Sequence, residues 1–380
     1  MIDGLLPELV RLRRELHRRA ELSSGEAATA EIVAGWLERL RPDALVRGLG
    51  GHGLAAAFDG AEAGETVLLR CELDALPVAE TAAAAHRSLD PAVSHACGHD
   101  GHMAILAGVG AALSARRPTT GRVVLLFQPA EETGEGAARV LADEKFRPLE
   151  PHHVFALHNL PKHPLGEVLV RRGTFSCASV GLAATLEGRT SHAAYPEHGA
   201  SPAAAVAELL RDLPKLPSSR ALRAGYALAT VTHARLGEPT FGVAPGEAVV
   251  LATLRAESDR HLRRVAEAAE ELVRTAAVRR GLGCRVTWEE PFRENRADPD
   301  ACLVVERAAG AVGRPVVLLP EPIRWCEDFS EFTARYPGAM FGLGSGEAQP
   351  QLHNPDYDFP DALIPVGASL FAAIVEEMLG

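Results

Sequence analysis

Apolar residues recur at three- and four-residue steps from Leu5 to about Leu40, which predicts helix, and "SSGE" near Ser23 indicates a break within it. Short uninterrupted apolar runs follow, and they predict the strands "GLAAAF", "ETVLLRCELDALP", "GRVVLLFQPAEE" and "HVFALHNLP". Between them, "DGHMAILAGVGAALSARR" and "GEGAARVLADEKF" predict helices. Fully apolar strands that alternate with helices are typical of α/β folds, so we expect a mostly parallel sheet flanked by helices on both faces.

The pattern changes near Cys177. Half-exposed strands are predicted for "SVGLAATLEG", "YALATVTHARLG", "EAVVLATLRAES" and "CRVTWEE", with helices at "SPAAAVAELLRDL" and "DRHLRRVAEAAEELVRTAAVRRG". This βαββαβ order predicts a small antiparallel sheet with two helices on one face. After Pro291 the chain returns to buried strands, "PVVLL" and "AMFGLG", and a closing helix. We therefore expect a discontinuous α/β domain, residues 1–176 and 291–380, that carries an inserted α+β domain, residues 177–290.

The length of the chain agrees with two domains, and its net charge argues against some classes of binding partner. The chain has 380 residues, 47% of them hydrophobic, and single hydrophobic cores stop growing near ~250 to 300 residues. A net charge of -11 argues against nucleic acid or an anionic membrane as partner, because both need a basic face. The basic run "RLRRELHRR" is interleaved with Leu and Glu at helical spacing, so we interpret it as a solvated helix face.

The chain shows no targeting or membrane signal. Its N-terminus reaches charged residues too early for the ~7 to 15 residue apolar core of a signal peptide. No apolar stretch approaches the ~18 residues that a membrane span needs. We expect a cytoplasmic protein whose six scattered cysteines are reduced.

The run "HACGHDGHMA" concentrates a thiol and three imidazoles in one short segment. Cys97 and His99 precede a predicted helix, whose N-terminus favours the thiolate, and both side chains are preferred ligands of zinc and similar ions. Two other interpretations remain open for this pair alone. Cys97 could be a buried core residue beside a solvated His99, or a nucleophile that His99 activates.

Polar residues also follow the predicted parallel strands, where ligands bind in such sheets. Asp74 follows "TVLLRCEL", Glu131 and Glu132 follow "RVVLLFQPA", and His158 follows "VFAL". In isolation, the two glutamates could be solvated residues before a helix. His353 lies in a second Leu-His-Asn triplet that repeats the one at His158.

Together these residues predict a metal centre. Five candidate ligands, Cys97, His99, Glu132, His158 and His353, exceed the usual three of a single catalytic metal, so two ions that share a bridging ligand fit better. Two ions ~3.5 to 4 Å apart lower the pKa of a shared water from ~15.7 toward ~7, and Glu131 remains as the base. The ligand types are compatible with zinc, manganese, nickel or cobalt.

The motifs "HACGHDGHMA", "FQPAEETGEGA", "ALHNLP", "SHAAYPEHGASP", "CEDFSEF" and "LHNPDYDF" resemble the M20 metallopeptidase superfamily over nearly the whole chain. Within it, they look like the amidohydrolase branch of hippurate hydrolases, aminoacylases, N-acetyldiaminopimelate deacetylases and auxin-conjugate hydrolases. The resemblance implies two divalent metal ions on the five ligands above, with Glu131 as general base and then general acid. It also implies hydrolysis of N-acyl amino acids.

Further roles come from the resemblance alone. The inserted domain would be a lid that mediates a homodimer. His192 in "SHAAYP" would bind substrate or stabilise the oxyanion, and Asp74 would be a carboxylate that orients a metal ligand without binding the ion itself. Thr240–Pro245, "TFGVAP", lacks an asparagine that relatives often carry there, so substrate specificity does not transfer.

Three alternatives stand beside this hypothesis. One is a thiol hydrolase in which Cys97 is the nucleophile. Another is a dipeptidase or aminopeptidase of the same superfamily. The last is a catalytically silent metal-binding or partner-binding relative.

Overall fold

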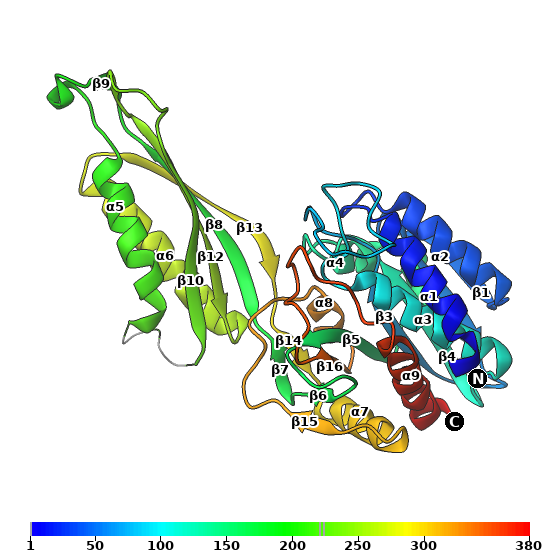
Figure 1. Cartoon of the computed structure of the whole chain (residues 1–380). Coiled ribbons are helices and arrows are strands. Elements are labelled where there is room, and N and C mark those ends of the chain that lie inside the picture. The colour runs from blue at the N-terminus through cyan, green and yellow to red at the C-terminus, as the bar shows by residue number, and fades with distance from the viewer. Residues whose placement is uncertain (1, 220–221, 223–224) are drawn as a thin grey trace. The chain divides into compact units, whose positions relative to one another are not determined.

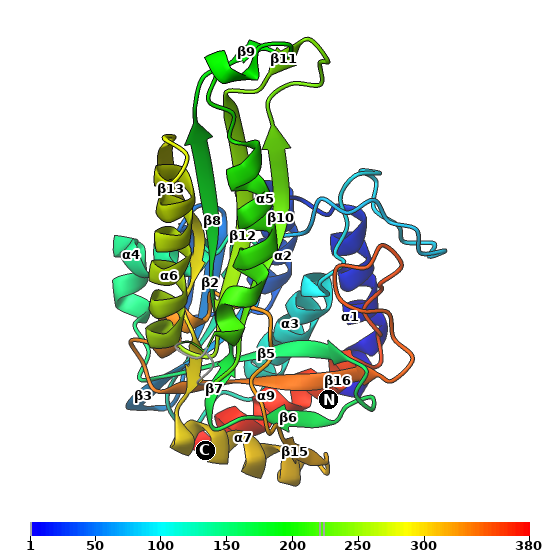
Figure 2. The same cartoon turned by 90° about the vertical axis from the view of Figure 1, so that its left-hand side faces the viewer.

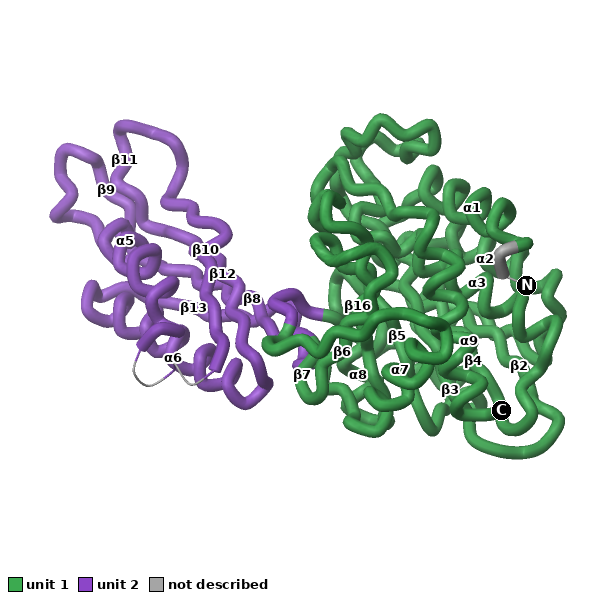
Figure 3. Tube along the Cα trace, turned by 60° about the horizontal axis from the view of Figure 1, so that its bottom comes forward, with its two compact units in different colours: residues 1–175, 295–322, 327–380 green, residues 176–294, 323–326 purple. Residues whose placement is uncertain are grey.

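The computed structural model describes residues 2–219, 222 and 225–380, and this part of the chain divides into two compact units (Figures 1 and 3). The smaller unit comprises Ser176–Glu294 and Ile323–Cys326, and the larger unit contains the rest. The division 177–290 expected from sequence omits Ile323–Cys326. These residues belong to the smaller unit because Ser176 and Ile323 form a parallel bridge, and the Cys177 N–H donates to the Ile323 carbonyl at 3.1 Å.

The larger unit is built on a mixed sheet with the strand order β1-β2-β4-β3-β5-β16-β6-β15. The central strands β4, β3, β5 and β16 run parallel to their neighbours in this group, as predicted, and antiparallel pairs occur toward the edges. The strands of this unit, with the small β7–β14 pair, are β1 (Ala44–Leu49), β2 (Gly53–Asp59), β3 (Glu62–Glu72), β4 (Thr120–Gln128), β5 (His153–Pro161), β6 (Val168–Val170), β7 (Gly173–Ser176), β14 (Asn295–Ala297), β15 (Val316–Leu318) and β16 (Gly338–Gly346).

Helices cover both faces of this sheet (Figure 1). Side chains alternate between the two faces of a strand. Val67 and Leu69 of β3 enter the core that α3 and α9 complete. Arg70 and Glu72 of the same strand point toward the face where α4 and α8 lie. The helices of the larger unit are α1 (Ile2–Arg18), α2 (Ala27–Arg39), α3 (His99–Ala115), α4 (Gly136–Ala142), α7 (Pro299–Ala311), α8 (Ser330–Thr333) and α9 (Leu363–Leu379).

Two details of this unit differ from the sequence-based expectation. The helix predicted over "GEGAARVLADEKF" ends at Ala142, because Asp143 is extended and its carboxylate accepts the N–H groups of Lys145 and Gly50, and the 3-10 helix η1 (Glu144–Leu149) follows. The interpretation of "RLRRELHRR" as a solvated face is wrong for Arg13 and His17, which are 1% and 0% exposed. Among the described residues, no helix has the length and apolar character needed to cross a bilayer.

The smaller unit has the predicted βαββαβ order. Its antiparallel sheet has the order β10-β12-β8-β13, and α5 and α6 pack side by side on one face (Figure 2). On β12 the buried side chains alternate with partly exposed ones, so one face of the strand meets the helices. The elements are β8 (Ala178–Glu187), β9 (Ser191–His192), η2 (Pro196–His198), α5 (Ala203–Asp212), η3 (Leu213–Ser218), β10 (Ala227–Leu236), β11 (Val243–Ala244), β12 (Glu247–Ala256), α6 (Asp259–Val278) and β13 (Gly283–Phe292).

Candidate metal centre

A tight turn presents Cys97 and His99 at the start of α3. Gly98 has φ +90° and caps the helix, and a Cβ atom placed there would lie 2.7 Å from Oδ1 of Asn159. Only glycine adopts this backbone conformation without strain and leaves room for the asparagine. The turn therefore brings Cys97 and His99 close to the end of β5, which carries His158 and Asn159.

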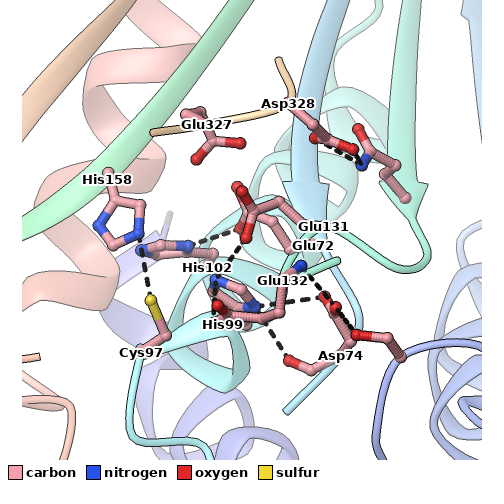
Figure 4. A network of polar contacts seen from close by, with 12 residues as sticks. Glu72, Asp74, Cys97, His99, His102, Glu131, Glu132, His158, Glu327 and Asp328 are labelled. Atoms are coloured by element: carbon pink, nitrogen blue, oxygen red, sulfur yellow. Dashed lines mark hydrogen bonds and ion pairs between the residues drawn. The ribbon is translucent and has the colours of Figure 1, made fainter. Parts of the chain in front are cut away.

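His99 is oriented by Asp74, which lies just beyond the end of β3 at Glu72. Nδ1 of His99 donates to the backbone carbonyl of Asp74 at 2.9 Å, so Nε2 carries the lone pair of the neutral ring. Nε2 lies 3.9 Å from Glu132 Oε1 and 4.0 Å from Glu131 Oε2, and neither Nε2 nor Glu132 Oε1 has a hydrogen-bond partner within the described structure (Figure 4). Opposed acceptor groups at this separation leave space for a cation between them.

Cys97 and His158 face each other in the same way. Sγ of Cys97 lies 3.5 Å from Nε2 of His158, and Nδ1 of His158 donates to the carbonyl of Asn159 at 3.0 Å (Figure 4). Burial holds the pKa of His158 well below its usual value, so the ring is neutral and able to bind a metal. His158 lies inside β5 rather than after it, because this strand continues to Pro161.

Glu132 and His353 complete the group. Oε2 of Glu132 lies 3.8 Å from Nε2 of His353. Both segments have non-glycine residues in the left-handed region, Ala130 at φ +50° and His353 at φ +66°. Such strained conformations cluster at functional sites, where surrounding contacts hold them. Here the Ala130 N–H donates to the buried Glu26 at 2.8 Å, and the His353 N–H donates to the Ala96 carbonyl at 2.9 Å.

The donor set fits divalent cations. Ligand atoms within 4.8 Å of one another form two overlapping groups, Cys97-His99-His158 and Cys97-Glu132-His353, which share the Cys97 sulfur. Burial would lower the pKa of His99, yet the carboxylates of Glu72, Asp74 and Glu132 outweigh it and raise that pKa to about 10. The site therefore favours a positive charge at this position, and metal ions would supply it.

Glu131 lies beside these ligands and is also buried. Its carboxylate, with those of Glu327 and Asp328, forms a group within 4.8 Å. Burial, followed by the charges of Glu327 and Glu132, raises the pKa of Glu131 well above its usual value. A carboxylate with a raised pKa is a better proton acceptor near neutral pH.

A network of charged side chains under the site is not predicted by the sequence. Arg70 is buried and pairs with Glu72, with Glu327 at 2.8 Å and with Asp328 at 2.6 Å. Asp328 also accepts from Gln128 at 2.8 Å (Figure 4). The motif "CEDF" is the only sequence signal for Glu327 and Asp328, and it gives no indication of their partner.

Sequence reasoning also misses His102. It lies one turn after His99 on α3, pairs with Glu72 Oε2 at 2.7 Å and makes a hydrogen bond with Asn159. Its three-residue spacing from His99 is the available signal, because residues at this spacing share a helix face. His102 thereby connects the end of β3 to the end of β5.

The two remaining predicted residues lie in different units. Asp74 Oδ2 accepts the backbone N–H of Glu132 at 2.9 Å and the Ser23 hydroxyl at 2.8 Å, so it contacts a predicted ligand directly. His192 belongs to the smaller unit, where it is exposed on β9 and pairs with Val243 of β11.

Comparisons with known proteins identify the family and the fold of this chain. Residues 68–377 match peptidase family M20/M25/M40. The chain is 28% identical to N-acetyl-L-cysteine deacetylase of Bacillus subtilis (strain 168), over 97% of this chain and 88% of that protein. It is 27% identical to IAA-amino acid hydrolase ILR1-like 2 of Arabidopsis thaliana, over 98% and 85%. The fold matches the crystal structure of Bacillus subtilis YXEP protein, a dinuclear metal binding peptidase from the M20 family, with a TM-score of 0.84 at 24% identity over 99% of both chains.

Proposed function

Since this chain belongs to peptidase family M20/M25/M40, we propose that it is an amide hydrolase that removes the acyl group from N-acyl amino acids. Relatives named as deacetylases and amino acid hydrolases support this substrate class. The observation that carries the proposal is the convergence of Cys97, His99, Glu132, His158 and His353, from distant segments, beside the buried carboxylate of Glu131.

The five converging side chains would hold two divalent ions, and Cys97 belongs to both groups of donors. When bound, such ions supply a Lewis acid that polarises the amide carbonyl and acidifies water. A thiolate ligand favours zinc, cobalt or nickel over the harder manganese. Asp74 holds the ring of His99 and the backbone of Glu132, so both ligands are oriented before an ion arrives.

Glu131 is the general base in this proposal. Its raised pKa enables it to take a proton from the attacking water, and the same carboxyl group then gives that proton to the departing amine. His192 is assigned to the oxyanion. Its Nδ1 accepts the Ala194 N–H at 3.0 Å, which places the hydrogen of the neutral ring on Nε2, and this N–H is a donor suited to a developing negative charge.

We also propose a homodimer through the smaller unit. Phe241 and Val243 of this unit are large apolar residues at 104% and 46% exposure, and Leu228 and Leu236 of the edge strand β10 are also exposed. Exposed apolar groups of this kind are typical of surfaces that bind another protein. Sedimentation of the wild-type protein beside Phe241→Ser tests this assignment, which predicts a dimer that the substitution weakens.

The test of the function is hydrolysis by protein reconstituted separately with zinc, manganese, nickel and cobalt, assayed with N-acetyl, N-benzoyl and indole-acyl amino acids. Glu131→Gln is expected to keep both ions and to lose roughly 10²- to 10⁴-fold in kcat. Glu135→Gln, an exposed glutamate on the same loop that pairs only with Arg139 in the described structure, is the matched control and keeps wild-type activity.

The other outcomes identify the alternatives. Cleavage of dipeptides in preference to every N-acyl amino acid indicates a peptidase of the same family. A metal-loaded wild type that cleaves no amide indicates a catalytically silent relative. Activity that survives chelation and disappears after thiol alkylation indicates Cys97 as the nucleophile.

A further inference from the structure

Arg13 of α1 is a buried arginine that lies outside the donor set. It is 1% exposed, and its guanidinium contacts three carboxylates. Nη1 donates to Asp100 at 3.0 Å and to Asp358 at 2.7 Å, and Nε forms an ion pair with Asp361 at 2.7 Å, although its N–H does not point at that oxygen. Nη2 lies 2.8 Å from Nε2 of His86.

The partners of Arg13 lie next to predicted metal ligands from two distant segments. Asp100 follows His99 directly, and Asp358 and Asp361 lie in the segment that leads from His353 to α9. A single nitrogen, Nη1, contacts both Asp100 and Asp358. Arg13 therefore joins the loop that carries Cys97 and His99 to the loop that carries His353.

The charges explain why this junction depends on an arginine. Asp100 is fully buried, and a buried carboxylate needs partners: Arg13 donates to its Oδ2 at 3.0 Å, and Nδ1 of His17 lies 2.9 Å from the same oxygen. Without a cation at this point, Asp100 and Asp358 would face each other as like charges. A planar guanidinium presents several donors in fixed directions, whereas a lysine ammonium is a point charge that cannot reproduce the pattern.

Other contacts between the two segments do not involve Arg13. The His353 N–H donates to the Ala96 carbonyl at 2.9 Å, and Phe359 packs on the bare backbone of Gly101, where a Cβ atom would lie 2.3 Å from the ring. These contacts remain when Arg13 is changed. A change at Arg13 thus alters the spacing of the two loops without removing the packing that holds them in the fold.

We infer that Arg13 is a positioning residue that sets the separation between Cys97 and His99 on one loop and His353 on the other, and so fixes the affinity for the ion that needs both loops. This inference rests on the proposed function for the identity of the ligands. It makes no claim about the acyl group or the reaction itself. Asp100 and Asp358 act with Arg13 as the two attachment points.

The experiment is a titration of the purified full-length protein with Zn²⁺ against a chromophoric chelator, and with Co²⁺ followed by its visible absorption. The variants are Arg13→Lys and Asp358→Asn, because Asp358 is partly exposed and its neutral form keeps the shape of the side chain. His353→Ala identifies the binding step that needs the second loop. Arg11→Gln is the matched control, since Arg11 is an exposed arginine of the same helix.

Arg13→Lys and Asp358→Asn are expected to weaken the step identified by His353→Ala by roughly 10- to 100-fold and to change the Co²⁺ spectrum, while Arg11→Gln stays within about twofold of wild type. Wild-type titrations for both variants would overturn the inference, and so would an equal loss in Arg11→Gln. A wild type that binds two ions and cleaves no amide would contradict the proposed function, and the titrations would still decide the role of Arg13.

Discussion

Asp74 accepts the backbone N–H of Glu132 at 2.9 Å on its carboxylate oxygen Oδ2. A residue just beyond the end of the parallel strand β3 thus fixes the segment that follows its neighbour β4. The backbone carbonyl of Asp74 also accepts from His99, so a single residue orients two predicted ligands on different segments. Asp74, at the edge of the sheet, therefore orients two predicted ligands of the metal centre.

Substitution of Asp74 separates its orienting role from its charge. Asp74→Ala leaves the Glu132 N–H without its acceptor, and zinc affinity is expected to fall roughly 10- to 100-fold. Asp74→Asn keeps an acceptor oxygen and should retain most of the affinity. Competition with a chelator measures the zinc affinity of both variants. Equal losses in the two variants would show that the charge of Asp74, rather than its hydrogen bond, supports the site.

Two helical glycines are expected to respond in opposite directions to alanine. A methyl group at Gly101 would overlap the ring of Phe359, so Gly101→Ala should lower the free energy of unfolding by about 1 to 3 kcal/mol. A methyl group at Gly35 of α2 would meet no neighbouring atom within 4 Å, and Gly35→Ala should raise this free energy by about 0.4 to 1 kcal/mol. Urea unfolding of both variants gives the comparison, and a shift of the same sign in both would contradict this account of the packing.

Because of His17, the free energy of unfolding is expected to depend on pH in the alkaline range. Its Nδ1 lies 2.9 Å from Asp100 Oδ2, and although burial lowers its pKa, Asp100 and Glu80 raise it from 6.5 to about 9. A raised pKa in the folded state gives stability that is fully present below pH ~6.5 and is lost as the pH rises through about 9. The stabilisation is of the order of 3 kcal/mol.

The measurement for His17 is the free energy of unfolding of wild type and His17→Gln between pH 6 and 10. The wild-type advantage should shrink across this range, because the variant has no proton to lose at this position. An advantage that stays constant with pH would mean that His17 contributes through packing alone.

Metal binding is expected to release a proton from Cys97. Burial, followed by the charges of Glu132 and Glu131, raises the pKa of this thiol well above its usual value, so the metal-free protein holds it protonated at pH 7. An ion that binds the thiolate must displace that proton. Zinc titration in buffers of different ionisation enthalpy measures the number released, and Cys97→Ser should lower it by about one.

The control for this titration is Cys284→Ser, at a partly exposed thiol of the smaller unit, which should release as many protons as wild type. The same high pKa argues against the thiol hydrolase, because a protonated thiol is a poor nucleophile. An unchanged proton count in Cys97→Ser would remove Cys97 from the ligand set.

Much of the fold could be predicted because its signals are local. The apolar runs before Asp74, Glu131 and His158 are strands β3, β4 and β5, and the parallel order of these strands brings the three residues to one edge. The break near Ser23 separates α1 from α2, as expected. Hydrophobic periodicity is a property of short segments, and strands that alternate with helices favour parallel pairing, so both features could be predicted.

The charged residues beneath and beside the site could not be predicted in the same way. In the sequence, Arg13 belongs to a helix face interpreted as solvated and Arg70 lies within an apolar strand, and no partner is indicated for either. Each is buried because carboxylates from distant segments surround it. Burial of an arginine depends on its partners, and the partners come together only in the tertiary structure. His102 escapes prediction for the same reason, since its contacts are Glu72 and Asn159 on two different strands.

The order of the ligands along the chain has a consequence for biosynthesis. Cys97 and His99 leave the ribosome long before His353, which lies near the C-terminus of the sequence and rests on the Ala96 carbonyl. A nascent chain can therefore offer only an incomplete set of donors until the segment with His353 has been translated. Full metal loading is therefore expected to follow synthesis of the His353 segment, and the proposed hydrolytic centre is assembled only after that segment has folded against Ala96.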